Sequence, residues 1–275
     1  GFNLHTTGPA FNTELGHAYK ALLEHVASRG YVVAFVRVQS GILSCDHKAM
    51  AQNLVDASAA LFENVSKADK TRVAFAGHSL GAKVALLGAR RTINQDPKNK
   101  WPDPQAVVLF NLSNDKPPVC TAPFEDTKVA ASELLADEKV RITFVHTDDD
   151  KIAVYDKADF GALDVYDALK IKYRQFIMLH GTGKDDANSA TDPELHDDHS
   201  GPLTVKGKPG GVADFAMPNS YLDALDWYGY WKILVGTLDF HFLKGDEKWA
   251  YGALRTHGGV ANGKVIKHVV LKQGW

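Results

Sequence analysis

The stretch TRVAFAGHSLGA, residues 71–82, decides the fold. It opens with a mostly apolar run, which predicts a buried strand over Thr71–Ala76. The next five residues read Gly-His-Ser-Leu-Gly and fit the pattern G-x-S-x-G. A helix is predicted directly afterwards, over Ala82–Ile93. A glycine-flanked serine between a strand and a helix is typical of a sharp turn that presents the serine hydroxyl, so Ser79 is the candidate nucleophile.

The chain on both sides of this stretch alternates between two patterns. Four further runs are almost continuously apolar and predict buried strands, at Tyr31–Val38, Ala106–Leu112, Val140–His146 and Arg174–His180. Longer amphipathic stretches predict helices at Glu14–Ser28, His47–Val65 and Ala158–Ile171. Such alternation favours an α/β fold with a doubly wound, mostly parallel sheet. We expect one domain over residues 1–275.

The last third of the sequence has a different pattern. Gly181–Asn219 is a long polar segment, and loops of this length are usually functional or disordered. A helix is predicted over Tyr221–Phe242 and a short edge strand over Lys264–Leu271. Four residues fall at helical spacing and predict a face that packs on the core: Trp227, Trp231, Leu234 and Leu238.

The composition narrows the possible partners. With 31 basic and 33 acidic residues the formal net charge is −2, and no long block of one sign occurs, which argues against nucleic acid as a main partner. No apolar run is long enough to span a membrane, so no transmembrane segment is predicted. The sequence has two cysteines, Cys45 and Cys120, which form one disulfide or are two separate thiols, and their spacing does not distinguish these alternatives.

The Gly-His-Ser-Leu-Gly motif and its setting resemble the α/β-hydrolase superfamily. In that fold the turn is so tight that the positions of Gly77 and Gly81 cannot hold side chains. The resemblance implies an oxyanion hole in which the backbone N–H of Leu80 is one donor. Gly1-Phe2 looks like the end of the superfamily's His-Gly-aromatic motif, which implies Phe2 N–H as the second donor.

The sequence also departs from the superfamily. About three strands usually precede the His-Gly-aromatic motif, and the sequence lacks them. The resemblance therefore leads us to expect that a missing segment or a separate chain supplies the N-terminal strands.

The catalytic acid is expected after the strand Val140–His146, because the order in this fold is serine, acid, histidine. Three aspartates follow that strand at positions 148–150. Asp150-Lys-Ile-Ala resembles the Asp-x-Ile-Ala context of polyester hydrolases and related secreted lipases, which implies Asp150 as the acid. Asp148 is the alternative.

The catalytic base is expected after the strand that ends at His180. His199-Ser-Gly-Pro resembles the His-x-x-Pro context of the same hydrolases and implies His199, with His196 as the alternative. His180 lies close to the strand, where a packed or hydrogen-bonded side chain is expected.

These residues predict a serine hydrolase that cleaves carboxylic esters through an acyl-enzyme on Ser79. The ester is a small molecule or a polymer. Alternatives are a lactone hydrolase or chlorophyllase-like esterase, or a non-catalytic binding protein on the same scaffold. No metal or other cofactor is required: two histidines three apart, without a helical H-E-x-x-H frame, are a weak zinc pattern. The resemblance slightly favours secretion over the cytoplasm.

Overall fold

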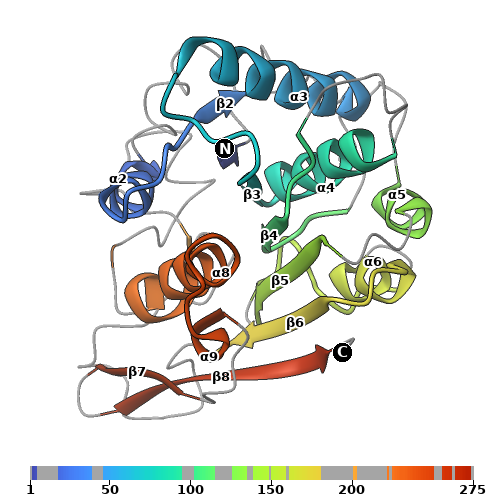
Figure 1. Cartoon of the computed structure of the whole chain (residues 1–275). Coiled ribbons are helices and arrows are strands. Elements are labelled where there is room, and N and C mark those ends of the chain that lie inside the picture. The colour runs from blue at the N-terminus through green and yellow to red at the C-terminus, as the bar shows by residue number, and fades with distance from the viewer. Residues whose placement is uncertain are drawn as a thin grey trace, which may run out of the picture.

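The structure is a computed structural model. The fold is centred on one mixed β-sheet (Figure 1). The structure describes residues 2–4, 18–38, 46–94, 102–114, 126–134, 139–148, 150–158, 161–180, 201–202, 222, 225–250, 256–261 and 264–273. Within them the sheet has eight strands in the order β2-β1-β3-β4-β5-β6-β8-β7. The first six are parallel, and β8 and β7 are added antiparallel beside β6. The predicted α/β fold with a mostly parallel sheet is confirmed.

The strands are mostly short, and β3, β4, β5 and β6 are almost wholly buried. Their bounds are β1 Phe2–Leu4, β2 Phe35–Arg37, β3 Ala74–His78, β4 Ala106–Phe110, β5 Arg141–Thr147, β6 Arg174–Leu179, β7 Thr256–Ala261 and β8 Lys264–Gln273. Every residue of β4 is buried, because helices cover both faces of the parallel part of the sheet.

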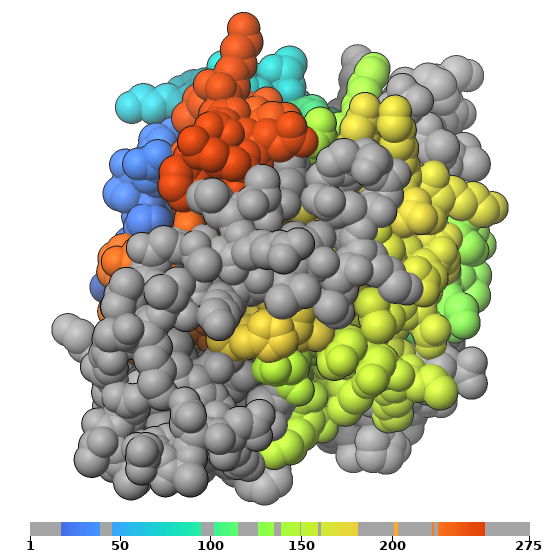
Figure 2. Space-filling view, turned by 90° about the horizontal axis from the view of Figure 1, so that it is seen from below, coloured from blue at the N-terminus to red at the C-terminus, as the bar shows by residue number. Residues whose placement is uncertain are grey.

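Helices cover the sheet in two layers (Figure 1). One layer holds α3 His47–Asn64, α4 Leu80–Ile93, α5 Thr127–Glu133 and α6 Ala162–Ala168. The other holds α2 Lys20–Ser28, the π-helical turn η2 Asp226–Tyr230, α8 Trp231–Leu243 and α9 Glu247–Ala250. In the view from below, α5 and α6 lie on one side of the molecule, and α2 and the end of α8 on the other (Figure 2). No helix in the described part of the chain is long and apolar enough to cross a membrane.

The five strands predicted before the polar segment all form, with shifted ends. The strand β3 runs to His78 rather than ending at Ala76, so that two residues of the motif continue the strand. The helix predicted from Ala82 begins at Leu80, directly after Ser79. The short elements β1, α5, α9 and β7 were not predicted, because three to seven residues carry too little periodicity.

Two predictions about the last third were wrong in part. Residues 264–273 form a strand, but β8 lies between β6 and β7 and is not an edge strand. Trp231, Leu234 and Leu238 are buried as predicted, whereas Trp227 is 45% exposed. The π-helical turn over residues 226–230 explains this difference, because its wider turn shifts the residues before α8 out of the α-helical phase.

Aromatic side chains hold the core on the α3–α6 side together. The Phe144 ring is fully buried in β5 and stacks on Phe176 of β6, with ring centroids 5.6 Å apart. Tyr166 of α6 meets Phe144 edge-on at 5.7 Å. Such pairs add to the free energy gained by burying the rings themselves.

A cavity of about 270 Å³ lies at the amino end of β3. Its apolar lining includes Val33, Phe62, Leu234 and Leu238, from both helix layers. Since Ser79 follows the carboxyl end of β3, this cavity is at the opposite edge of the sheet.

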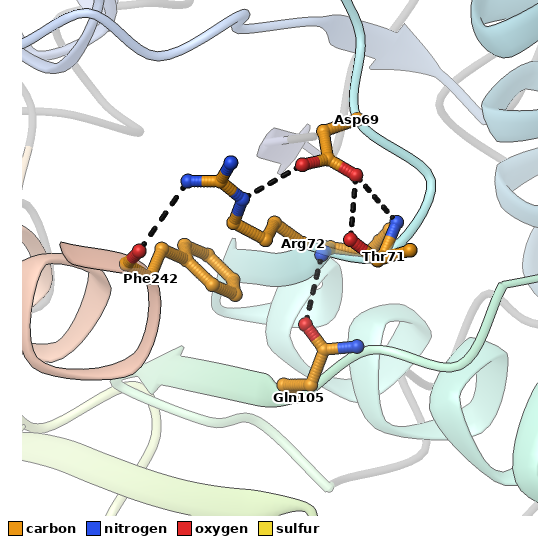
Figure 3. A network of polar contacts seen from close by, with 6 residues as sticks. Asp69, Thr71, Arg72, Gln105 and Phe242 are labelled. Atoms are coloured by element: carbon orange, nitrogen blue, oxygen red, sulfur yellow. Dashed lines mark hydrogen bonds and ion pairs between the residues drawn. The ribbon is translucent and has the colours of Figure 1, made fainter. Parts of the chain in front are cut away.

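A polar network borders this cavity (Figure 3). The Asp69 carboxylate accepts hydrogen bonds from the Thr71 hydroxyl at 2.6 Å, the Thr71 N–H at 2.9 Å and Arg72 Nε at 2.7 Å. These bonds, led by that from the Thr71 hydroxyl, lower the pKa of Asp69 to about 2. Arg72 also contacts the Phe242 carbonyl oxygen, so the loop before β3 is linked to the end of α8.

We predict that Phe144→Ala lowers the free energy of unfolding by about 3–5 kcal/mol, because the cavity left among rigid aromatic rings cannot close. Urea denaturation measures this loss. The control is Val129→Ala on α5, whose side chain is 51% exposed and whose loss should stay below about 0.5 kcal/mol. A loss below about 1 kcal/mol for Phe144→Ala would contradict the packing described.

Candidate active site

Ser79 occupies a strained turn between β3 and α4. Its backbone has φ 56° and ψ −124°, a conformation that non-glycine residues rarely adopt. The turn is held by hydrogen bonds on both sides: Ser79 N–H donates to the Phe110 carbonyl at 2.9 Å, and the Ser79 carbonyl accepts from Ala82 N–H at 3.0 Å. Strain of this kind persists only where the surrounding structure over-determines the conformation, and it concentrates at functional sites.

The two glycines of the motif allow this turn. A Cβ atom added at Gly77 would lie 2.1 Å from the Gly81 carbonyl oxygen, far inside van der Waals contact. The strand and the helix therefore cross with backbone against backbone. The sequence-based expectation that this turn excludes side chains agrees with the geometry at Gly77.

The start of α4 lies directly beside the candidate nucleophile. Leu80 is the first residue of the helix, where backbone N–H groups are not used within the helix and the dipole favours negative charge. Its position directly after Ser79 suits its N–H to a developing oxyanion.

The structure does not support Phe2 as the second donor. Phe2 lies in β1 and pairs with Phe35 on one side and Ala76 on the other. Ala76 is three residues before Ser79, or about 10 Å along the strand, so Phe2 N–H lies within the sheet and not at its carboxyl edge. A second donor would come from the chain after Leu4, where β1 reaches that edge.

The candidate acids follow β5, two strands from Ser79. Asp150 is buried, and its Oδ1 accepts hydrogen bonds from the backbone N–H groups of Ile152 at 2.9 Å and Ala153 at 2.7 Å. This tight turn orients the carboxylate. Asp148 is half-exposed, and its Oδ2 lies 2.5 Å from His180 Nδ1. The two aspartates thus have different surroundings.

The base candidates are only partly covered by the structure. His196 and His199 lie outside the described residues, although Gly201 and Pro202, just beyond them, are buried. His180 is described and is hydrogen-bonded to Asp148, as the sequence predicted for a histidine beside the strand. It follows β6, and the strands β6 and β3 are three positions, or about 14 Å, apart across the sheet. A base that serves Ser79 must come from a loop that reaches back over β5 and β4.

Sequence reasoning missed one residue of this edge. Asn111 follows β4 beside Ser79, is fully buried, and has φ 44°. Its N–H donates to the Val145 carbonyl at 2.9 Å and its side-chain amide to Thr147 Oγ1 at 3.1 Å. Asparagine tolerates this left-handed conformation better than most residues, which is the one signal in the sequence. Asn111 thereby ties the edge next to Ser79 to the strand that carries the acids.

The fold and the strained serine turn together define an α/β-hydrolase. The family model for lipase (class 3) matches residues 12–149, just over half of the chain, so the chain belongs to the class 3 lipase family and is a carboxylic ester hydrolase. The match includes Ser79 and ends one residue before Asp150.

One similar solved structure comes from work on LipS and LipT, two metagenome-derived lipolytic enzymes. It is 12% identical, and the alignment covers 66% of this chain and 82% of that chain with a TM-score of 0.46. No curated protein is significantly similar in sequence.

We predict that Gly77→Ala lowers the free energy of unfolding by about 3 kcal/mol and abolishes ester hydrolysis, because the added methyl group pushes α4 away from β3. The control is Gly30→Ala, where φ is +90° but no atom lies within 4 Å of the added carbon. It should cost about 1 kcal/mol and leave activity intact. Urea denaturation and p-nitrophenyl butyrate hydrolysis measure both effects. Equal behaviour of the two variants would refute the backbone crossing.

Proposed function

We propose that this class 3 lipase cleaves its ester through an acyl-enzyme on Ser79, with Asp150 and His199 completing a catalytic triad. The observation that carries the proposal is the strained turn at Ser79. Nothing in the packing of a plain strand–helix connection requires a serine at φ 56°, whereas a nucleophile that must stand clear of the sheet does.

Asp150 is our choice for the acid because of its surroundings. A triad acid is buried and held in one orientation, so that it fixes the tautomer of the histidine and stabilises its charged form. Asp150 meets both conditions through burial and two backbone hydrogen bonds to a single carboxylate oxygen. Asp148 is half-exposed and already contacts His180.

His199 is our choice for the base. The spacing across the sheet favours a histidine on a long loop over His180, which directly follows β6. His196 and His199 lie in the polar stretch 181–200 that follows His180 in the sequence. The resemblance of His199-Ser-Gly-Pro to the His-x-x-Pro context favours the second of them.

The reaction then takes two steps. His199 removes the proton from Ser79 as the oxygen attacks the ester carbonyl, and the protonated imidazole returns it to the leaving alcohol. The N–H of Leu80 and a second donor after β1 bind the oxyanion, each contributing roughly 3 kcal/mol to the lower barrier. Water, deprotonated by the same histidine, releases the acid and restores Ser79.

We predict that Ser79→Ala lowers kcat for p-nitrophenyl butyrate by about 10⁴-fold or more and abolishes labelling by a fluorophosphonate probe. The control is Ser113→Ala. Ser113 is at the same sheet edge, and its backbone N–H donates to the Ser79 carbonyl at 3.4 Å, so the substitution removes the hydroxyl and keeps this bond. Full labelling of the Ser79→Ala variant would refute the proposal.

We predict that kcat in the same assay differs sharply between variants of the chosen acid and base and variants of the alternative residues. Asp150→Asn should lower kcat by about 10⁴-fold, because the amide holds the wrong histidine tautomer, and Asp148→Asn by less than ten-fold. Among the histidines, His199→Ala should abolish turnover, while His196→Ala and His180→Ala retain most of it. Turnover retained in His199→Ala but lost in one of the other two would move the base to that residue.

A further inference from the structure

A buried tyrosine touches the residue that precedes the nucleophile. Tyr19, the residue just before α2, is 4% exposed, and its hydroxyl oxygen lies 2.6 Å from Nδ1 of His78. His78 is 5% exposed and is the last residue of β3. The contact joins residues 59 positions apart in the chain. It is therefore a tertiary contact made directly behind the serine turn.

The protonation of Tyr19 and His78 limits how this hydrogen bond can form. Burial raises the pKa of the Tyr19 hydroxyl well above its usual value of 10, so the phenol keeps its proton at neutral pH. A neutral imidazole has one acceptor nitrogen and one N–H. The neutral phenol either donates to Nδ1 or accepts from an Nδ1–H, according to the His78 tautomer. In either tautomer the bond fixes the orientation of the His78 ring.

Movement of His78 is transmitted directly to Ser79. The two residues share a peptide bond, and Ser79 is held at φ 56° by backbone hydrogen bonds to Phe110 and Ala82. His78 also pairs with Phe110 in the ladder between β3 and β4. A strained turn needs its flanking residues fixed, and on the strand side the His78 side chain is the one that can be anchored, because Gly77 has none.

The partner of His78 is itself well fixed. Tyr19 packs in the core cluster on the α2–α8 side, together with Leu22, Val26 and Phe110. One hydrogen bond therefore connects the start of α2 to the turn that carries Leu80.

We propose that Tyr19 is a positioning residue for catalysis: its hydroxyl fixes His78, and through His78 it holds Ser79 and the N–H of Leu80 in the geometry that the reaction needs. This inference rests on the proposed function of Ser79. Tyr19 takes no part in proton transfer to the substrate.

The test is Tyr19→Phe, which removes one oxygen and leaves the ring. We expect kcat for p-nitrophenyl butyrate to fall about ten-fold with KM changed less than two-fold, because the loss is in the alignment of the reacting groups. The rate of fluorophosphonate labelling at Ser79 should fall in parallel. Tyr166→Phe is the matched control: Tyr166 is equally buried, but its hydroxyl makes a 3.4 Å contact to Arg174 on the other face.

A second variant tests the same bond from the His78 side. His78→Asn keeps an oxygen near the position of Nδ1, so it should retain most of kcat while Tyr19 is present, whereas His78→Leu should match Tyr19→Phe. Adding Tyr19→Phe to His78→Leu should cause no further loss, because the bond is already absent.

The outcomes are separable. A folded Tyr19→Phe protein with wild-type kcat and labelling rate overturns the positioning role, even if its Tm is lower. If Tyr19→Phe fails to fold, a His78→Leu protein with wild-type kcat overturns it as well. If the wild-type protein is not labelled at Ser79, the proposed function itself fails, and this inference fails with it.

Discussion

The close approach of the backbone at Gly77 to that at Gly81 is the constraint on which the site depends. With 2.1 Å between a hypothetical Cβ and a carbonyl oxygen, no other residue type fits at position 77. This contact brings α4 directly onto the end of β3, and the chain between them has to turn within a single residue. Ser79 therefore adopts a strained backbone conformation, which places it at the carboxyl ends of the strands, beside the N-terminus of α4.

The rest of the fold supplies what this strained turn needs. The parallel strands β3, β4 and β5 carry Ser79, Asn111 and the acidic turn to one common edge, because parallel strands end on the same side. The two helix layers bury both faces of these strands, so the edge cannot shift without disturbing the core. Hydrogen bonds between the ends of neighbouring strands, such as that from the Asn111 side chain to Thr147, fix the positions of the residues at this edge.

Sequence patterns predicted the central elements well and the periphery less well. The continuously apolar runs identified β2 to β6, because strands covered on both faces need apolar residues at every position. Short elements were not predicted. The strand β1 has only three residues, and α5 depends on an N-cap by Asp126 that hydrophobic periodicity does not show. The place of Phe2 in the sheet was not predicted for the same reason, since a strand this short is recognised only from its pairing with β2 and β3. The position of β8 inside the sheet depends on its long-range antiparallel pairing with β6, which local pattern cannot reveal.

The candidate site divides in the same way. Sequence alone determined the nucleophile turn, because a strand, two glycines around a serine and a helix are all local features within the twelve residues 71–82. It also indicated the aspartates after β5 as candidates for the acid. Only the tertiary structure distinguished buried Asp150 from half-exposed Asp148, paired His180 with Asp148, and brought Tyr19 against His78. Burial, strand order and contacts between distant residues arise from packing the whole chain, and no local stretch of sequence carries them.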